Sequence, residues 1–300
     1  MPRFGAHLSI AGRPPREGGV DRAVERARRI RADCLQLFVK SPSQWRFAPL
    51  EEEEVERFRA AAREAALTPL VGHASYLVNL ASPDAALYEK SQRCVLEEWD
   101  RAERLGLDYL VLHPGSHTGS GAAAGLARIA VALDWLHRER PEHTARILLV
   151  TTAGAGGILC GRFEHFRYIL GTCEASPRLG VAIDTCHLFA AGYDLRTRAA
   201  IDETLGRLDE MAGLARVRVV HANDSKGDLG SGLDRHEHIG RGRLGREAFR
   251  LLVNHPALAA LPFILETPKE DARGRKMDPV NLRALRGLLS NYDRPRPNDE

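Results

Sequence analysis

The sequence predicts an α/β protein that folds as one (β/α)8 barrel, the TIM-barrel architecture. Short apolar runs rich in β-branched residues begin 30 to 46 residues apart along the chain, and charged or alanine-rich stretches lie between them. Continuous apolar strands of this kind are typical of parallel sheets with both faces covered by helices. Eight strand–helix units without a break in composition fit a single barrel domain over residues 1–290. The polar segment 291–300 contains two prolines and is expected to be a flexible tail.

One strand is expected in each apolar run. The runs are short and uninterrupted, so periodicity alone does not separate them from buried helical segments, but their β-branched residues favour strands. The expected strands begin at Phe4, Cys34, Leu70, Tyr109, Ile147, Val181, Val217 and Phe263.

A helix is expected after each strand. Ser82, Pro83 and Asp84 are predicted to provide an N-cap, a first-position proline and an acid in the first turn. The stretch from Glu51 opens with four glutamates, which suit the positive end of a helix dipole. The expected helices cover Asp21–Ala32, Glu51–Ala66, Pro83–Leu105, Ala122–Arg140, Phe163–Cys173, Ile201–Ala212, Arg243–Asn254 and Pro279–Leu289.

A doubly wound open sheet is the alternative fold for this pattern. The first strand–helix connection, SIAGRPPREGG, contains no GxGxxG motif, so nothing supports dinucleotide binding. The longest excursion from the pattern runs from His221 to Leu261 and includes the polar, glycine-rich segment NDSKGDLGSGLDRHEHIGRGRLG. A long loop without secondary structure inside a compact domain is usually functional.

Composition excludes several classes of protein. The hydrophobic share of 44% excludes a long disordered or fibrous chain. The 43 basic and 40 acidic side chains give a formal net charge of only +3, which does not by itself indicate a nucleic-acid partner. No apolar run approaches the ~20 residues of a membrane span, and residues 1–5 show no hydrophobic signal segment. We therefore expect a cytoplasmic protein without a membrane segment, and a monomer.

The five cysteines are scattered and form no CxxC pair. A disulfide framework or a thiolate zinc site is therefore not expected, and these residues are predicted to be small buried side chains.

Histidines and carboxylates stand at most of the expected strand ends. In a barrel these carboxyl-terminal ends converge on one mouth, where the chemistry of the fold takes place. One histidine at a strand end is usually structural, but a recurring pattern favours a metal or polyacid site. The residues are His7, His73, His113, Asp184, His221 and Glu266.

Two short motifs add further ligands. Asp184 and His187 are spaced i, i+3, so both can face one centre if the strand runs into a turn. Asp234 and His236 are spaced i, i+2, which places both on one side of an extended segment. Histidine with carboxylate favours Zn²⁺ or Mn²⁺, and a set this large predicts a multi-metal hydrolytic centre suited to phosphoryl transfer.

Other chemistries find weaker support. Gly154-Ala155-Gly156-Gly157 follows the fifth strand, but it lacks the GK[ST] ending of a phosphate loop, so a tight turn is the simpler interpretation. Ser116 and His117 are adjacent and point apart, and no third group orients the histidine. Cys186 beside His187 meets the same objection as a nucleophile.

Several motifs together resemble the endonuclease IV family. They occur in order from Phe4 to about Leu289 and read GAHLSIAG, LQLFVKSPSQW, HASYLVNLAS, HPGSH, DTCHLFAAGYD, HANDSK, GSGLDRHEHIG and LET. DTCH followed by AAGYD, and DRH, are the most specific. Members of this family are zinc-dependent apurinic/apyrimidinic endonucleases of base-excision repair.

The resemblance implies three zinc ions, with Mn²⁺ as an alternative metal. The implied ligands are His73 and His113 for the first metal, Asp184, His221 and Glu266 for the second, and His187, Asp234 and His236 for the third. A water activated at the metals held by His73, His113, Asp184, His221 and Glu266 is the implied nucleophile.

The family's ninth ligand is missing from this chain. In the family a glutamate in the fifth-strand motif LE[NT]TAG bridges the first two metals, but residues 149–154 read LVTTAG here, with Val150 at that position. Without the bridge, nothing offsets the repulsion between two neighbouring cations, and the first metal keeps two neutral imidazoles. We therefore expect that metal to be weakly held or absent, and incision to be slower by at least ~10²-fold.

The resemblance also indicates DNA contacts. Some members insert an arginine and a tyrosine into the duplex at the lesion, and here those positions are Ser43 and Tyr76. Gln44 matches a glutamine near the lesion, and Arg46 or Trp45 is a candidate to fill the gap left by the missing arginine. Residues on the mouth loops that are expected to contact phosphates are Lys40, Lys226, Arg235 and Arg241, with a solvated face as the alternative for each. His7 and Gln36 are expected to line the pocket.

The implied reaction is hydrolysis of the phosphodiester 5′ to an abasic deoxyribose in double-stranded DNA. It would leave a 3′-hydroxyl and a 5′-deoxyribose phosphate, and blocked 3′ ends would be trimmed at the same site. Two alternatives stay open. Val150 allows a catalytically impaired abasic-DNA-binding protein, and the barrel with a smaller metal set allows a sugar isomerase or epimerase.

Overall fold

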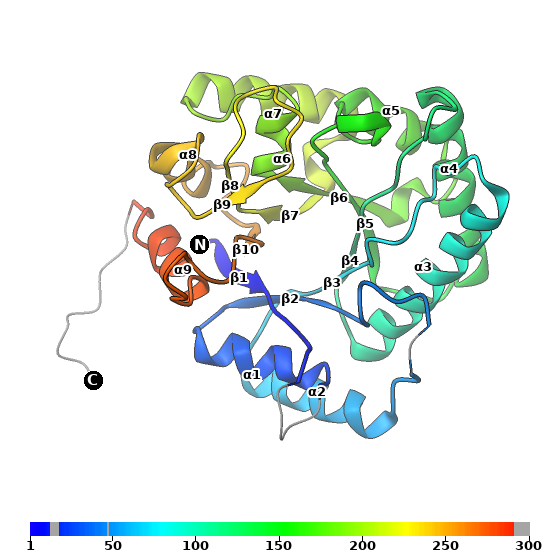
Figure 1. Cartoon of the computed structure of the whole chain (residues 1–300), viewed down its shortest axis with the longest axis horizontal. Helices are drawn as coiled ribbons and strands as arrows, with labels where there is room; N and C mark the ends of the chain where they lie inside the picture. Colours follow the sequence, from blue (N-terminus) through cyan, green and yellow to red (C-terminus); the bar gives the residue numbers. More distant parts are fainter. Residues whose placement is uncertain (13–17, 47, 291–300) are drawn as a thin grey trace.

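Parallel strands form a closed barrel in the computed structural model, which describes residues 1–12, 18–46 and 48–290. Within these residues eight strands follow one another around the barrel in the order β1, β10, β7, β6, β5, β4, β3, β2, and β1 pairs with β2 to close it. Helices surround the strands (Figure 1). The barrel strands are β1 (Arg3–His7), β2 (Cys34–Phe38), β3 (Leu70–His73), β4 (Tyr109–Leu112), β5 (Arg146–Val150), β6 (Leu179–Asp184), β7 (Val217–His221) and β10 (Pro262–Leu265). The predicted (β/α)8 barrel is confirmed, and each strand begins within two residues of its expected start.

The expected helices are also present, with bounds within three residues of the prediction. They are α1 (Asp21–Arg29), α2 (Glu52–Glu64), α3 (Ala85–Leu105), α4 (Ala122–Glu139), α5 (Phe163–Thr172), α7 (Arg198–Ala212), α8 (Gly245–Val253) and α9 (Asp278–Arg286). A short helix that the sequence did not predict, α6 (Thr185–Ala190), directly follows β6.

The start of α3 differs from the prediction. Asp84 is the N-cap, and its carboxylate accepts a hydrogen bond of 2.8 Å from the backbone N–H of Leu87. Ser82 is not the cap, because Asp84 is still in an extended conformation and Pro83 therefore lies outside the helix. The hydroxyl of Ser82 instead accepts a hydrogen bond of 3.1 Å from the N–H of Asp84.

The excursion between His221 and Leu261 is structured rather than a bare loop. Besides α8 it contains an antiparallel pair of short strands, β8 (Asp224–Ser225) and β9 (His236–Glu237). The buried carboxylate of Asp224 accepts backbone N–H groups from Gly242 at 2.9 Å and Leu244 at 3.0 Å, which closes the base of the excursion. Residues 226–235 form the connection between β8 and β9.

The barrel interior is filled by an apolar plug. Successive side chains of a strand point to opposite faces of the sheet. A residue two positions after a plug residue therefore also points into the barrel, nearer to its mouth. The plug consists of Cys34, Val71, Val111, Leu148, Val150, Ala182, Val219 and Ile264. All five cysteines are buried and unpaired, as predicted.

None of the described helices combines the length and apolar character that a membrane span requires. The predicted tail, residues 291–300, lies outside the described residues.

Candidate metal centre

The mouth of the barrel is ringed by inward-facing residues at or just after the strand ends. The alternation above the apolar plug explains this ring, because each strand places one side chain there. Going through the chain, the ring positions are His7, Gln36, His73, His113, Val150, Asp184, His221 and Glu266. Among the described residues of the ring, Val150 alone is apolar.

A first group of donor atoms comes from β6, β7 and the residue after β10. Ligand atoms of Asp184, His221 and Glu266 lie within 4.8 Å of one another. The Nδ1 atom of His221 is 3.2 Å from Glu266 Oε2 and 3.9 Å from Asp184 Oδ2. These residues are far apart in sequence and meet only because the strands neighbour one another in the barrel.

A second group joins α6 to the β8–β9 excursion. His187 Nε2 lies 3.2 Å from Asp234 Oδ2, and His236 Nε2 lies 3.3 Å from Asp234 Oδ1. His187 is directed here because Asp184 caps α6, accepting the backbone N–H of His187 at 2.9 Å. The i, i+3 spacing of Asp184 and His187 is thus realised as a strand end followed by one short helix.

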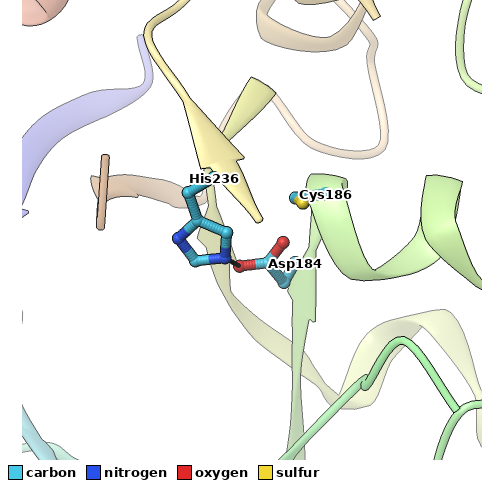
Figure 2. Close-up of side chains that lie close together, drawn as sticks. All are labelled: Asp184, Cys186 and His236. Carbon is cyan, nitrogen blue, oxygen red and sulfur yellow. Dashed lines mark ion pairs between the residues drawn. The ribbon is translucent and has the colours of Figure 1, made fainter. Parts of the chain in front are cut away.

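The two groups touch through Asp184. Figure 2 shows the His236 ring from β9 directed at the Asp184 carboxylate, with 3.6 Å between Nε2 and Oδ2. Cys186 lies beside this pair and completes a third set of donor atoms within 4.8 Å. Burial, with help from Asp184, raises the pKa of the Cys186 thiol to about 12. Cys186 is therefore a poorer ligand at neutral pH than the imidazoles and carboxylates around it.

Each histidine of the two groups has one ring nitrogen bound to an oxygen. His187 Nδ1 donates to Thr151 O at 2.7 Å, His236 Nδ1 donates to Glu266 O at 3.2 Å, and His221 Nε2 donates to Gln36 Oε1 at 2.8 Å. In a neutral ring such bonds fix the tautomer and leave the other nitrogen with its lone pair.

Those other nitrogens have no hydrogen-bond partner. Among the described residues, His187 Nε2, His221 Nδ1 and His236 Nε2 are buried polar atoms that make no hydrogen bond. Unsatisfied buried polar atoms are rare in proteins and call for a ligand. Nitrogen and carboxylate oxygen are the donor set of Zn²⁺ and Mn²⁺, so both groups fit a divalent cation.

His73 and His113 differ from these groups. Their ring centroids are 5.4 Å apart, and His73 Nδ1 donates to Ala74 O at 2.7 Å. Within the described residues, neither histidine belongs to a set of three donor atoms that could hold an ion. The neighbouring ring position is Val150, which is fully buried and packs into the apolar plug. The expectation that these two histidines hold a metal therefore stays a prediction.

The pKa values also separate two histidines of these groups, His187 and His236, from His113. Burial by itself would lower the pKa of His187 and His236, but Asp184 and Asp234 outweigh it and raise these pKa values to about 9 and about 10. Burial lowers the pKa of His113 well below its ordinary value, and the neighbouring imidazoles lower it further.

Most of the residues expected to contact DNA lie exposed around this mouth. Tyr76 is 69% exposed and lies edge-on against Phe38, with ring centroids 5.3 Å apart. Partial burial and the nearby Glu266 and Asp234 carboxylates raise the pKa of Tyr76 to about 12, so it stays a neutral phenol. The other exposed residues of the expected set are Ser43, Gln44, Arg46, Lys226, Arg235 and Arg241.

Lys40 does not belong with these exposed residues. Its side chain is 1% exposed, and its ammonium group lies 3.1 Å from the fully buried carboxylate of Glu98. The expectation that Lys40 contacts DNA phosphates does not fit this placement, because the charge is directed into the protein.

His7 and Gln36 belong to the ring at the barrel mouth, and their expected role in lining a pocket stays a prediction. Gln36 is fully buried, and its amide oxygen accepts the hydrogen bond from His221. Its amide nitrogen donates to Glu266 and lies 2.9 Å from His7 Nδ1. The carbonyl of Thr151 and the side chain of Asn223, which donates to Asp184 Oδ2 at 2.7 Å, also orient ligands. No sequence signal singled out these last two, because their role depends on contacts across the barrel.

Comparison with known proteins identifies the family. The chain matches the family model described as a xylose isomerase-like TIM barrel over residues 24–288. It is 46% identical, over 289 residues, to a protein of Chloroflexus aggregans named probable endonuclease 4, covering 96% of this chain and 98% of that protein. The chain belongs to the endonuclease IV family.

Solved structures agree with this membership. The crystal structure of endonuclease IV from Thermus thermophilus matches this chain with a TM-score of 0.82 at 38% identity, covering 96% of this chain and 98% of the other. A D-tagatose 3-epimerase-like protein matches with a TM-score of 0.69 at 17% identity, covering 94% of each chain, and this likeness shows the fold alone. The resemblance to endonuclease IV inferred from the motifs is confirmed.

Proposed function

We propose that this member of the endonuclease IV family hydrolyses the phosphodiester 5′ to abasic sites in double-stranded DNA. The products would be a 3′-hydroxyl and a 5′-deoxyribose phosphate, and blocked 3′ ends would be trimmed at the same site. Family membership makes the chain a DNA-repair endonuclease. The observation that best supports the reaction is the pair of histidine–carboxylate groups joined at Asp184 in the barrel mouth.

These residues have distinct roles in the proposal. Asp184, His221 and Glu266 would hold one ion, and His187, Asp234 and His236 another. Bound divalent cations would supply the nucleophile at neutral pH and neutralise charge on the scissile phosphate. Gln36, Thr151 and Asn223 hold the ligands in place before any ion binds.

The loops around the barrel mouth suit a nucleotide that is turned out of the DNA double helix. A nucleotide without its base can be turned out of the duplex at small cost and enter the pocket. Tyr76, exposed beside the mouth, is placed to occupy the gap left in the base stack. Exposed Arg46, Lys226 and Arg235 would bind the backbone phosphates, and the protein would act as a monomer.

Val150 limits the activity in this proposal. Among the described residues no carboxylate completes a set of three donor atoms with His73 and His113, so a third ion would be held weakly or not at all. The loss of one electrostatic stabiliser slows catalysis by ~10²-fold in other enzymes, and we expect a deficit of that order here.

The test is incision of a duplex carrying one tetrahydrofuran abasic analogue, which resists elimination. The strand is labelled at its 5′ end, and the chain is assayed after chelation and then with added Zn²⁺ or Mn²⁺. We expect metal-dependent cleavage immediately 5′ to the analogue, with an end that DNA polymerase extends. Cleavage on the 3′ side, or an end that is not extended, contradicts the proposed reaction.

Val150 also supports a second candidate, an abasic-DNA-binding protein that no longer cuts. Tight binding of the abasic duplex over an undamaged one, without incision at any metal concentration, would favour it. Isomerisation of a free ketose in place of incision would favour a sugar isomerase or epimerase instead.

A further inference from the structure

A buried ion pair lies behind the mouth of the barrel, outside the metal centre. Lys40 follows β2, and Glu98 lies on α3. Their side chains are 1% and 0% exposed, with 3.1 Å between Nζ and Oε1. Removing two charges from water is costly, and the best-attested reason for keeping such a pair is that it specifies one geometry.

The pair joins two loops at the mouth. We call residues 39–46 the β2 loop and residues 74–84 the β3 loop. The ammonium group of Lys40 donates to the carbonyl of Gln44 at 2.6 Å, which closes the turn of the β2 loop. The second carboxylate oxygen of Glu98 accepts the backbone N–H of Ser75 at 3.0 Å, which holds the β3 loop. Gln44 and Tyr76, the neighbour of Ser75, are both exposed.

Helix α3 supports both loops at further points. Arg101 donates to the carbonyl of Val39 at 2.8 Å, and Lys90 lies 4.2 Å above the ring of Trp45. The hydroxyl of Ser91 accepts the backbone N–H of Asn79 at 3.0 Å. The helix therefore acts as a common frame on which the two loops are mounted.

We propose that the Lys40–Glu98 pair is a positioning tether that fixes the β2 loop and the β3 loop at one spacing, so that both engage an abasic duplex together. This inference rests on the proposed function, because it takes abasic DNA as the ligand of the loops. Loops held in their bound arrangement lose less conformational freedom on binding. The tether holds Gln44 through its backbone and Tyr76 through the preceding residue, and it makes no contact with the metal ligands.

The decisive variant is the double replacement Lys40→Met with Glu98→Gln. Methionine keeps the length of the lysine stem, and glutamine keeps an oxygen that can accept the N–H of Ser75. The double variant therefore removes both charges at once and leaves neither charge buried without its partner. The single variant Lys40→Arg retains the charge and is the conservative rescue. Asp100→Asn is the matched control, because it removes a carboxylate from the same helix that pairs instead with Arg140.

Each variant is assayed with two substrates. One is the abasic duplex with 2-aminopurine beside the analogue, whose fluorescence reports unstacking. The other is bis(p-nitrophenyl) phosphate, a diester too small to reach the loops. We expect the double variant to raise KM for the duplex between ~10- and ~100-fold and to weaken the fluorescence change. Its turnover of the small diester, its bound metal and the behaviour of Asp100→Asn should match the parent chain.

The result that overturns the tether is an unchanged KM and fluorescence change in the double variant. An equal loss on both substrates, or a loss of bound metal, also overturns it, because that result indicates a structural role. A parent chain that neither binds nor cuts the abasic duplex, while still hydrolysing the small diester, contradicts the proposed function rather than the tether.

Hydrogen exchange of the unmodified chain gives a measurement that does not depend on folding of a variant. Amides of the β2 loop and the β3 loop should exchange at a common rate in the free protein and become protected together when the abasic duplex is added. Independent exchange of the two loops would refute the tether.

Discussion

Both halves of the barrel mouth carry histidines, but the histidines have different partners. Around β6, β7 and the β8–β9 excursion, carboxylates lie 3.2 to 3.9 Å from the imidazole nitrogens of His187, His221 and His236. Around β3, β4 and β5 the ring positions are His73, His113 and Val150, and neither histidine belongs to a set of three donor atoms among the described residues. We call these the carboxylate half and the valine half. The comparison shows that, among the described residues, the donor sets able to hold an ion occur where carboxylates lie beside the imidazoles.

Breaking the carboxylate half should have the largest effect. Asp184→Ala removes the side chain that contacts both complete groups and caps α6, so we expect incision of the abasic duplex to fall by about 10³-fold or more. Single-turnover incision and metal content by mass spectrometry measure the loss. Asp194→Asn, at a partly exposed carboxylate that pairs with Arg196, is the matched control. A variant within tenfold of the parent would show that Asp184 does not organise the centre.

Making the valine half resemble the other should have the next largest effect. Val150→Glu supplies a carboxylate beside His73 and His113, and we expect incision to rise by ~10²-fold while bound metal rises by about one ion per chain. Val150→Gln, which adds length and polarity without the charge, should give neither gain. If Val150→Glu and the parent cut equally well and bind equal metal, another group already completes this half.

Removing one histidine from each half sharpens the comparison. We expect His187→Ala to slow incision by ~10²-fold, because it breaks a complete group. His113→Ala should cost less than tenfold, since its site is already incomplete. Titration of Zn²⁺ into each chelated variant, followed by incision, gives both values. Equal losses would mean that the halves contribute alike.

The smallest expected effect concerns protonation of the metal-free chain. With pKa values near 9 and 10, His187 and His236 should carry protons at pH 7, whereas burial keeps His113 neutral. A raised folded-state pKa stabilises the fold below the unfolded value near 6.5, and this stabilisation is lost as pH rises through 9 to 10. A lowered pKa acts in the opposite sense, and the fold loses stability as pH falls below 6.5.

Nitrogen NMR of the chelated protein tests this directly. The ring nitrogens of His187 and His236 should show the doubly protonated form at pH 7, and those of His113 should not. Denaturant unfolding between pH 6 and pH 10 should show a steeper decline for the chelated parent than for His187→Ala. If the imidazoles of both halves are neutral at pH 7, the predicted difference in charge between the two halves is wrong.

The positions of histidines and carboxylates at the expected strand ends predicted much of the site from the sequence. Parallel strands bring their carboxyl ends together, so His73, His113, Asp184, His221 and Glu266 could be placed at one mouth without coordinates. Only the resemblance to the endonuclease IV motif marked Val150 as a position without a ligand, because an apolar residue in a buried strand is otherwise ordinary; the structure places it in the ring. Whether it weakens metal binding stays a prediction.

Contacts between distant elements could not be predicted in this way. Gln36 meets His221 only because β2 and β7 face each other across the barrel, and Glu98 meets Lys40 only because α3 turns that carboxylate inward. A lysine on a mouth loop suggested a phosphate contact, since nothing local to Lys40 in the sequence reveals its buried partner. The β8–β9 pair escaped prediction because each of its strands is only two residues long.

The β8–β9 excursion has a further consequence. Asp224 fastens its base. His236, which pairs with Ser225, lies against Asp184, and Asp234 on the connecting segment lies against His187. An ion held there would act as a clasp between a ribbon and the body of the protein.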